Sequence, residues 1–169
     1  FGNVIHTEPR DMYVSRVIAL NSGLNKDSCA LTVNRLCGSG LQAIVSASQL
    51  ILLGDTEIAL AGGVEVMSSG THVVKGFRWG NRMGASKVFD MMLGALHDPF
   101  GHGHMGITAE NISERYQIDR SKQDEFALNS QTRAKEAIEK GLFKEQITPI
   151  EIKSRKGINI FDTDEHPKY

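Results

Sequence analysis

The sequence predicts a layered α/β fold, in which helices pack on a mixed sheet. Helix-like and strand-like segments alternate with short connections over the first 67 of its 169 residues. The strand-like run at residues 57–63 is apolar throughout, without the alternation of a sheet that faces water on one side. A hydrophobic content of 40% suffices for an ordinary core, and the length suits one domain or one domain plus part of another.

The first half supplies the alternating elements. Residues 11–24 are predicted as a helix that ends at Gly23, and residues 27–34 as a buried strand. A second helix is predicted from about Ser39 to Gly54, followed by the buried strand at 57–63. The apolar stripes of the two helices are Met12, Val17, Ile18 and Leu20, and then Leu41, Ile44, Val45, Ala47 and Leu52.

The pattern changes after Met67. Residues 68–106 contain eight glycines and no sustained period, which predicts a long, irregular but ordered loop. The pattern therefore predicts a change of organisation near residue 67.

Regular elements return in the last third of the chain. A short helix is predicted at 105–118, and Asp119 is a suitable N-cap for a longer helix that Gly141 ends. Residues 147–153 and 158–162 flank a four-residue turn and predict a hairpin. The inner face of the long helix is predicted to comprise Phe126, Ala127, Ser130, Ala134, Ala137 and Ile138.

Charge and composition exclude several function classes. A net charge of −1 offers no basic field for nucleic acid, and no apolar run reaches the roughly 20 residues that cross a bilayer. Two cysteines do not make a disulfide framework, which favours a reducing compartment. Bacterial, mitochondrial and peroxisomal enzymes share this profile, and among them we expect a bacterial-like cytoplasmic location. Cys29, inside a predicted strand, is expected to be a core residue.

Cys37 lies between a predicted strand and a predicted helix, in the run "VNRLCGSGLQAI". A thiol at a helix N-terminus has its thiolate form stabilised by the helix dipole and by free N–H groups. Gly38 and Gly40 leave room for a substrate to approach the sulfur, and the same turn aims N–H groups at a developing oxyanion. The alternative from the residues alone is a cysteine that opens a helix for packing reasons.

Several motifs resemble those of the thiolases. "VNRLCGSGLQAI" is followed at family spacing by "IALAGGVEVMS", "HMGITAEN" and "QDEFALNSQ", so the resemblance covers essentially the whole chain. "TEPRDMY", "RWGNRMG" and "MMLGALHDPF" are most similar to the bacterial β-ketothiolase branch.

The resemblance implies a thiolase-like fold and a ping-pong acyl transfer in fatty acid metabolism. Cys37 would carry the acyl group as a thioester and its backbone N–H would face the oxyanion, while the partners would be acetyl-CoA, 3-ketoacyl-CoA and CoA. No metal or prosthetic group is implied, since CoA is a substrate. His104 and Met105, in the "HMG" motif, and Leu96 would contact the CoA and acyl groups. The family also implies a homodimer or homotetramer.

The catalytic histidines and second cysteine of the family lie in "GHP"-type and "CxGGG"-type motifs, and neither motif occurs here. His166, followed by Pro167, lacks the glycine-rich frame and is expected in a surface loop. The resemblance therefore implies an internal piece of the family's N-terminal half, with a partial core domain at residues 1–67 and a partial loop domain, which covers the substrate, at residues 68–169. We expect this piece to have no turnover alone.

Three other hypotheses remain at this stage. His97, His102 and His104, with Asp98 or Glu110, could form a metal-binding module. Residues 71–87 are basic and aromatic, and Phe77, Arg78 and Trp79 could anchor a contact with another subunit, or fold on their own domain. The ketoacyl synthases also use a cysteine in this fold, but they lack the "CGSG" and "HMG" motifs.

Overall fold

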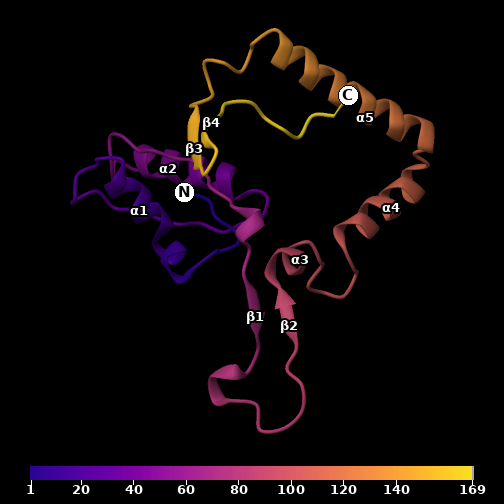
Figure 1. Ribbon diagram of the computed structural model, residues 1–169, viewed down its shortest axis with the longest axis horizontal. Coiled ribbons are helices and arrows are strands. Elements are labelled where there is room, and N and C mark those ends of the chain that lie inside the picture. The colour runs from indigo at the N-terminus through magenta and orange to yellow at the C-terminus, as the bar shows by residue number, and fades with distance from the viewer. Residues whose placement is uncertain (169) are drawn as a thin grey trace. The chain divides into compact units, whose positions relative to one another are not determined.

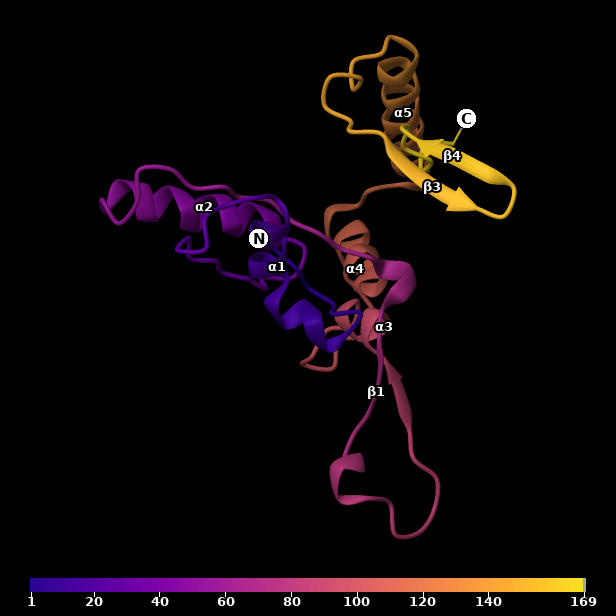
Figure 2. The same cartoon turned by 60° about the vertical axis from the view of Figure 1, so that its left-hand side comes forward.

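The computed structural model describes residues 1–168, and the chain divides into two compact units. The first unit ends at Met105 and the second begins at Gly106. Figures 1 and 2 show the elements of each unit. The domain boundary expected after residue 67 concerns the family's core and loop domains, and it stays a prediction.

The first predicted helix is present and ends where the sequence indicates. It starts as a 3₁₀ turn at Pro9–Tyr13 and continues as α1, Val14–Asn21. Gly23 then takes a φ of 85°, a left-handed conformation that glycine adopts without a steric penalty. The N–H of Leu24 donates to the carbonyl of Ala19 at 3.0 Å, which closes the helix end.

Three extended segments run parallel in the first unit and meet at Gly2. Gly2 forms isolated parallel bridges with Val33 on one side and Gly63 on the other. The Gly2 N–H donates to the Gly62 carbonyl at 2.9 Å and the Asn3 N–H to the Val33 carbonyl at 3.1 Å. The Gly2 segment is therefore the middle one of the three.

The predictions of buried strands at residues 27–34 and 57–63 are wrong in extent and burial. Each segment contributes only the single bridge to Gly2, and most of its residues are exposed. The apolar runs predicted burial, which needs a covering layer on both faces, and residues 1–168 do not provide that cover.

The second helix, α2 at Ser39–Leu52, begins and ends as predicted. Gly54 takes a φ of 80°, and the N–H of Asp55 donates to the carbonyl of Leu50 at 3.0 Å. The helix therefore starts two residues after Cys37, with Gly38 as its N-cap.

The predicted irregular loop contains short regular elements. A 3₁₀ turn at Met67–Ser69 precedes strand β1, His72–Val74, which pairs antiparallel with β2, Val88–Asp90. Between the strands, Phe77–Trp79 forms another 3₁₀ turn. In Figures 1 and 2 this paired segment projects as an arm from the rest of its unit. Strands of three residues are too short to leave a readable period in the sequence.

Helix α3, Met91–Ala95, follows β2 directly. The Asp90 carboxylate caps it by accepting N–H bonds from Met92 at 2.8 Å and Leu93 at 3.2 Å. His72, opposite Asp90 across the strands, lies 4.0 Å from the same carboxylate.

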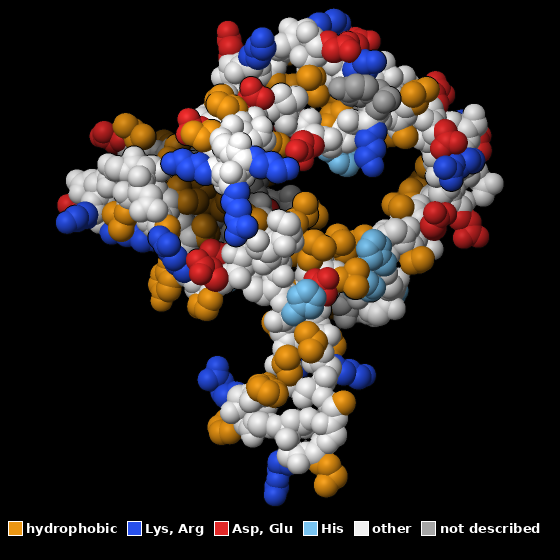
Figure 3. Space-filling view, viewed as in Figure 1, with side chains coloured by type: hydrophobic (Ala, Val, Ile, Leu, Met, Phe, Trp, Pro, Cys, Tyr) orange, Lys and Arg blue, Asp and Glu red, His pale blue; other side chains and the backbone are white. Residues whose placement is uncertain are grey.

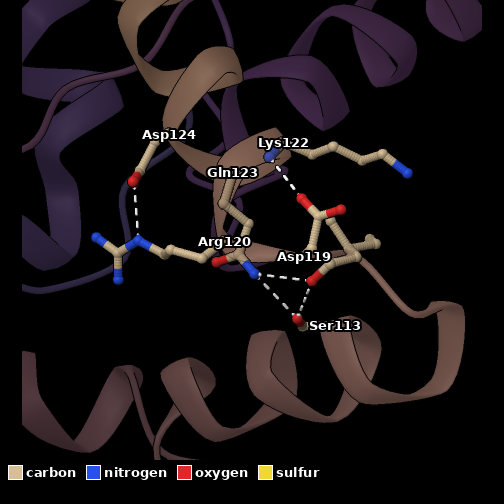
Figure 4. A network of polar contacts seen from close by, with 7 residues as sticks. Ser113, Asp119, Arg120, Lys122, Gln123 and Asp124 are labelled. Atoms are coloured by element: carbon tan, nitrogen blue, oxygen red, sulfur yellow. Dashed lines mark hydrogen bonds and ion pairs between the residues drawn. The ribbon is translucent and has the colours of Figure 1, made fainter.

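The helices of the second unit agree with the sequence. Helix α4 spans Met105–Tyr116, and α5 spans Arg120–Glu139. Asp119 is the N-cap of α5 and accepts the Lys122 N–H at 2.8 Å (Figure 4). The α5 helix ends before Gly141, whose φ is 67°.

The hairpin is also confirmed. Strand β3, Ile150–Ser154, pairs antiparallel with β4, Gly157–Phe161, and Ser154 faces Gly157 across the turn. The segment after β4 returns to α5, where the Lys168 N–H donates to the Gln131 side chain at 2.7 Å.

Few side chains are buried within residues 1–168. The buried apolar residues are Ile5, Ala19 and Ala43. The predicted inner face of α5 is covered in part: Ala134, Ala137 and Ile138 are half-buried, whereas Phe126, Ala127 and Ser130 are exposed, Phe126 at 78%. No helix in the described part of the chain is long and apolar enough to cross a membrane.

Candidate functional site

Cys37 lies just beyond the carboxyl end of the segment at Val33 and just before α2. Its thiol is free and exposed. The carboxyl ends of parallel segments followed by a helix are a common place for substrate sites in α/β folds. The structure thus puts the sequence-predicted nucleophile at a point that a substrate can reach.

The turn that carries Cys37 is fixed by two polar side chains. The Ser39 hydroxyl accepts the N–H of Arg35 at 2.8 Å and donates to the carbonyl of Leu36 at 2.6 Å. The Asn34 side-chain oxygen accepts the Leu36 N–H at 3.0 Å, and its amide donates to the Val4 carbonyl at 3.2 Å. The turn is therefore tied both to α2 and to the middle parallel segment.

Leu36, next to Cys37, has a left-handed backbone. Its φ is 47°, a conformation that costs a non-glycine residue roughly 1 kcal/mol or more. Such a turn between a strand end and a helix resembles the sharp elbow that presents a nucleophile in hydrolases.

Glycines allow close approach of the backbone around this turn. A Cβ added to Gly2 would lie 2.5 Å from the Ser39 carbonyl carbon and 2.7 Å from the Gly40 nitrogen. The middle segment and the start of α2 are thus in backbone contact. At Gly40 an added Cβ would meet no atom within 4 Å, and at Gly38 the nearest atom would be the Arg35 carbonyl oxygen, 3.4 Å away; the role of these glycines in substrate approach stays a prediction.

A carboxylate joins the ends of two parallel segments beside the turn. Glu65 accepts the N–H groups of Val4 at 3.0 Å and Ile5 at 2.9 Å, and the side-chain amide of Asn3 at 3.2 Å. Since Val4 also accepts from Asn34, Glu65 and the Cys37 turn hold the same stretch of backbone.

The predicted CoA-contact residues come together on one loop. His97 and His104 form an antiparallel bridge, and the Met105 N–H donates to the Leu96 carbonyl at 2.8 Å. The two imidazole rings meet edge to face with centroids 5.2 Å apart, and Nδ1 of His97 lies 2.8 Å from the Leu93 carbonyl oxygen. The Leu96 and Met105 side chains are exposed.

The structure gives no support to a metal-binding module. Within residues 1–168, no group of three or more His, Cys, Asp or Glu side chains is arranged to hold a metal ion. His97 and His104 meet without a third ligand.

Two expectations about other residues have opposite outcomes. Cys29 is exposed, so its prediction as a core residue is wrong: the segment that carries it lacks the predicted covering layer. His166 lies in an exposed loop, as predicted.

Sequence reasoning missed Asn34, Ser39, Gly2 and Glu65. Ser39, a helix-capping residue type placed just inside a helix start, was a readable signal for a local hydrogen bond. Glu65 and Gly2 contact residues that are distant in the sequence, and no local sequence pattern indicates such contacts.

Comparisons with known proteins agree on one family. The family described as "Thiolase, N-terminal domain" matches residues 1–169. The chain is 60% identical to the beta-ketothiolase BktB of Cupriavidus necator, over 100% of this chain and 43% of that protein. It is 47% identical to an acetyl-CoA acetyltransferase of Syntrophomonas wolfei, over 92% of this chain and 40% of that protein.

Solved structures give the same result. The crystal structure of the Bacillus anthracis acetyl-CoA acetyltransferase superposes with a TM-score of 0.92 at 43% identity, covering 99% of this chain and 42% of that one. Human mitochondrial 3-ketoacyl-CoA thiolase in complex with CoA superposes with a TM-score of 0.90 at 37% identity, covering 98% and 41%.

The chain spans less than half of the length of these relatives. The fold and the family match over the whole chain agree with each other. The chain belongs to the thiolase family and has its α/β fold.

Proposed function

We propose that the full-length protein containing this chain is an acetyl-CoA C-acyltransferase that uses Cys37 as its acyl carrier. The observation that carries the proposal is the exposed Cys37 thiol on a left-handed turn at the start of α2. The names of the relatives, a beta-ketothiolase and an acetyl-CoA acetyltransferase, support this reaction class.

In the degradative direction, the Cys37 thiolate attacks the 3-keto carbon of a 3-ketoacyl-CoA. The bond between C2 and C3 breaks, and the departing enolate takes a proton to become acetyl-CoA. A second CoA thiolate attacks the Cys37 thioester, releases the shortened acyl-CoA and restores the Cys37 thiolate. Condensation of two acetyl-CoA molecules is the reverse sequence, and covalent capture divides one difficult step into two easier ones.

We assign binding roles to Leu96, His104 and Met105, and the oxyanion to the Cys37 N–H. The support is the loop that brings the first three residues together and the CoA complex of a related human thiolase. CoA is both a substrate and its own binding handle, so no metal or prosthetic group enters the reaction. The cytoplasmic location stays a prediction.

Mass spectrometry of the acyl-enzyme tests the proposal. Full-length protein mixed with acetyl-CoA should gain one acetyl group on the peptide that contains Cys37, and added CoA should remove it. Cys37→Ser should abolish both the label and thiolysis, whereas Cys29→Ser, at the other exposed cysteine, should keep them. Normal turnover of Cys37→Ser would refute the proposal.

The arm formed by β1, β2 and the residues between them supports a second role, in subunit contact. Trp79 is 89% exposed and Phe77 62% exposed, so neither side chain folds back on its own unit. Figure 3 shows apolar and basic side chains together on the arm. Exposed aromatic and arginine side chains of this kind dominate protein interfaces.

Sedimentation of the full-length protein tests this contact. Trp79→Ala should shift a homotetramer toward dimers, or a homodimer toward monomers, while Lys156→Ala, in the turn between β3 and β4, should not change the assembly. An unchanged sedimentation coefficient for Trp79→Ala would show that the arm is not the contact.

A further inference from the structure

We propose that Ser39 and Asn34 are positioning residues that hold the Leu36 turn and thereby fix the direction of the Cys37 thiol. This inference rests on the proposed acyl transfer at Cys37. Neither side chain needs to touch the substrate, because both act through the backbone of the residue before the nucleophile.

Ser39 has the burial and the bonding of a residue with a structural task. It is only 4% exposed, and its hydroxyl both accepts from Arg35 and donates to Leu36. A buried hydroxyl is costly unless it is hydrogen-bonded, and this one uses a donor and an acceptor function. Because Gly38 is the N-cap of α2, the Ser39 hydroxyl does not cap its own helix but reaches back to the turn.

Asn34 holds the same turn from the other side. Its oxygen accepts the Leu36 N–H at 3.0 Å, so both the N–H and the carbonyl of Leu36 have side-chain partners. Its amide donates to the Val4 carbonyl, and the N–H of Val4 is bound by Glu65. The turn is thus anchored to the parallel segments as well as to α2.

Leu36 explains why such support is needed. At a φ of 47° its backbone is less stable than in the ordinary regions, and it stays there only if the surroundings hold it. Without Ser39 or Asn34, Leu36 can relax toward negative φ, and the next residue along the chain is Cys37. A rotation at Leu36 therefore moves the sulfur directly.

A misdirected sulfur slows acyl transfer more than it weakens substrate binding. A displacement of about 1 Å at a reacting atom can cost on the order of 100-fold in rate. The residues assigned to CoA binding lie on the separate loop at 96–105, so binding should persist. A role confined to overall stability would lower the apparent kcat only through the folded fraction, so it would leave kcat per folded, native enzyme molecule unchanged.

Steady-state thiolysis by the full-length Ser39→Ala protein is the first test. We expect kcat to fall about 10- to 100-fold and the KM for 3-ketoacyl-CoA to change less than about threefold. Ser48→Ala is the matched control. Like the Ser39 hydroxyl, the Ser48 hydroxyl donates to a backbone carbonyl, that of Ile44 at 2.9 Å, but it lies far along α2 from Cys37. Ser48→Ala should keep kcat within about twofold.

A double-mutant cycle tests the role of Leu36. Glycine adopts positive φ without penalty, so in a Leu36→Gly background the Ser39→Ala change should lower kcat less than about threefold. An equal loss in both backgrounds, or an unchanged kcat for Ser39→Ala, would overturn the inference.

If Ser39→Ala does not fold, Asn34→Ala tests the positioning role instead, because Asn34 is exposed and its removal leaves no cavity. An unchanged kcat for Asn34→Ala would then overturn the inference. If Cys37 is never acylated in the unsubstituted protein, the proposed function fails, but iodoacetamide alkylation of Cys37 still reports its position. Equal alkylation rates in the unsubstituted and both substituted proteins would then overturn the positioning role.

Discussion

The Asp11 carboxylate shows how single residues fix the first turn of the chain's first helix. Its Oδ2 accepts both the hydroxyl and the N–H of Thr7, each at 2.6 Å, and the N–H of Glu8 at 3.3 Å. The Thr7 hydroxyl and N–H bonds hold the pKa of Asp11 below its usual value, because they stabilise the ionised form. The ionised Asp11 carboxylate therefore adds to the free energy of unfolding above its unfolded-state pKa of about 3.9, and this contribution is lost as the pH falls through the folded-state pKa.

Replacement of Thr7 tests this account. Thr7→Val keeps the shape of the side chain but removes its O–H donor, so the pKa of Asp11 should rise toward its usual value. NMR titration of the Asp11 carboxyl carbon in the full-length protein measures the change. Thr56→Val removes a hydroxyl that donates to the Ile58 carbonyl and should leave the titration of Asp11 unchanged. If Asp11 titrates identically in Thr7→Val, the hydroxyl does not stabilise the carboxylate.

For single residues, the sequence predicts a role correctly where that role depends on near neighbours in the chain. Gly23, Gly141 and Asp119 were predicted at helix ends and lie there, since each acts within one turn of the chain. The position of Cys37 before α2 was predicted for the same reason. Gly2 was not predicted, because its close contact with Ser39 and Gly40 joins segments nearly 40 residues apart.

At the scale of elements, the start of α5 depends on one cap. The Asp119 carboxylate accepts the Lys122 N–H, while the Gln123 side-chain amide donates to the Ser113 hydroxyl and the Ile118 carbonyl (Figure 4). Asp119→Ala should cost about 1 kcal/mol, which would speed amide exchange at Lys122 about fivefold. Hydrogen exchange followed by NMR or mass spectrometry measures the effect.

Asp124 provides the control on the same helix. Its ion pair with Arg120 has an N–O distance of 2.8 Å, but the two side chains are 85% and 61% exposed, and exposed pairs of this spacing contribute about 0.3–0.5 kcal/mol. Asp124→Ala also gains helix propensity, so amide exchange at Lys122 should stay within about twofold. Equal acceleration by both substitutions would mean that charge, and not capping, stabilises this helix end.

Helices were predicted better than strands. The start of α2, the N-cap of α5 and the hairpin of β3 and β4 follow local signals, namely caps, glycines and a four-residue turn. The segments at 27–34 and 57–63 carry the composition of strands, but a strand exists only where its neighbours pair along its length. The β1–β2 pair was missed because three-residue strands show no period.

For the molecule as a whole, the apolar pattern predicted more burial than residues 1–168 contain. Burial requires two complementary surfaces, and the sequence reveals only one of them at a time. Leu41, Ile44 and Val45 form the predicted stripe of α2, yet all three are exposed. The chain covers 43% of the length of a 60% identical relative. Residues 1–168 therefore do not cover the apolar face of α2.

A polypeptide of these 169 residues, expressed alone, should therefore fold weakly and lack thiolase turnover. Ile5, Ala19 and Ala43 bury too little apolar surface, at about 25 cal/mol per Å², to offset the conformational entropy of a chain of this length. We expect a broad thermal transition by circular dichroism, strong binding of the dye ANS and no release of acetyl-CoA from 3-ketoacyl-CoA. The full-length protein serves as the control in all three assays. A sharp, cooperative transition without ANS binding would show that the buried core suffices. Sustained turnover would show that these residues supply all the catalytic groups that the reaction needs.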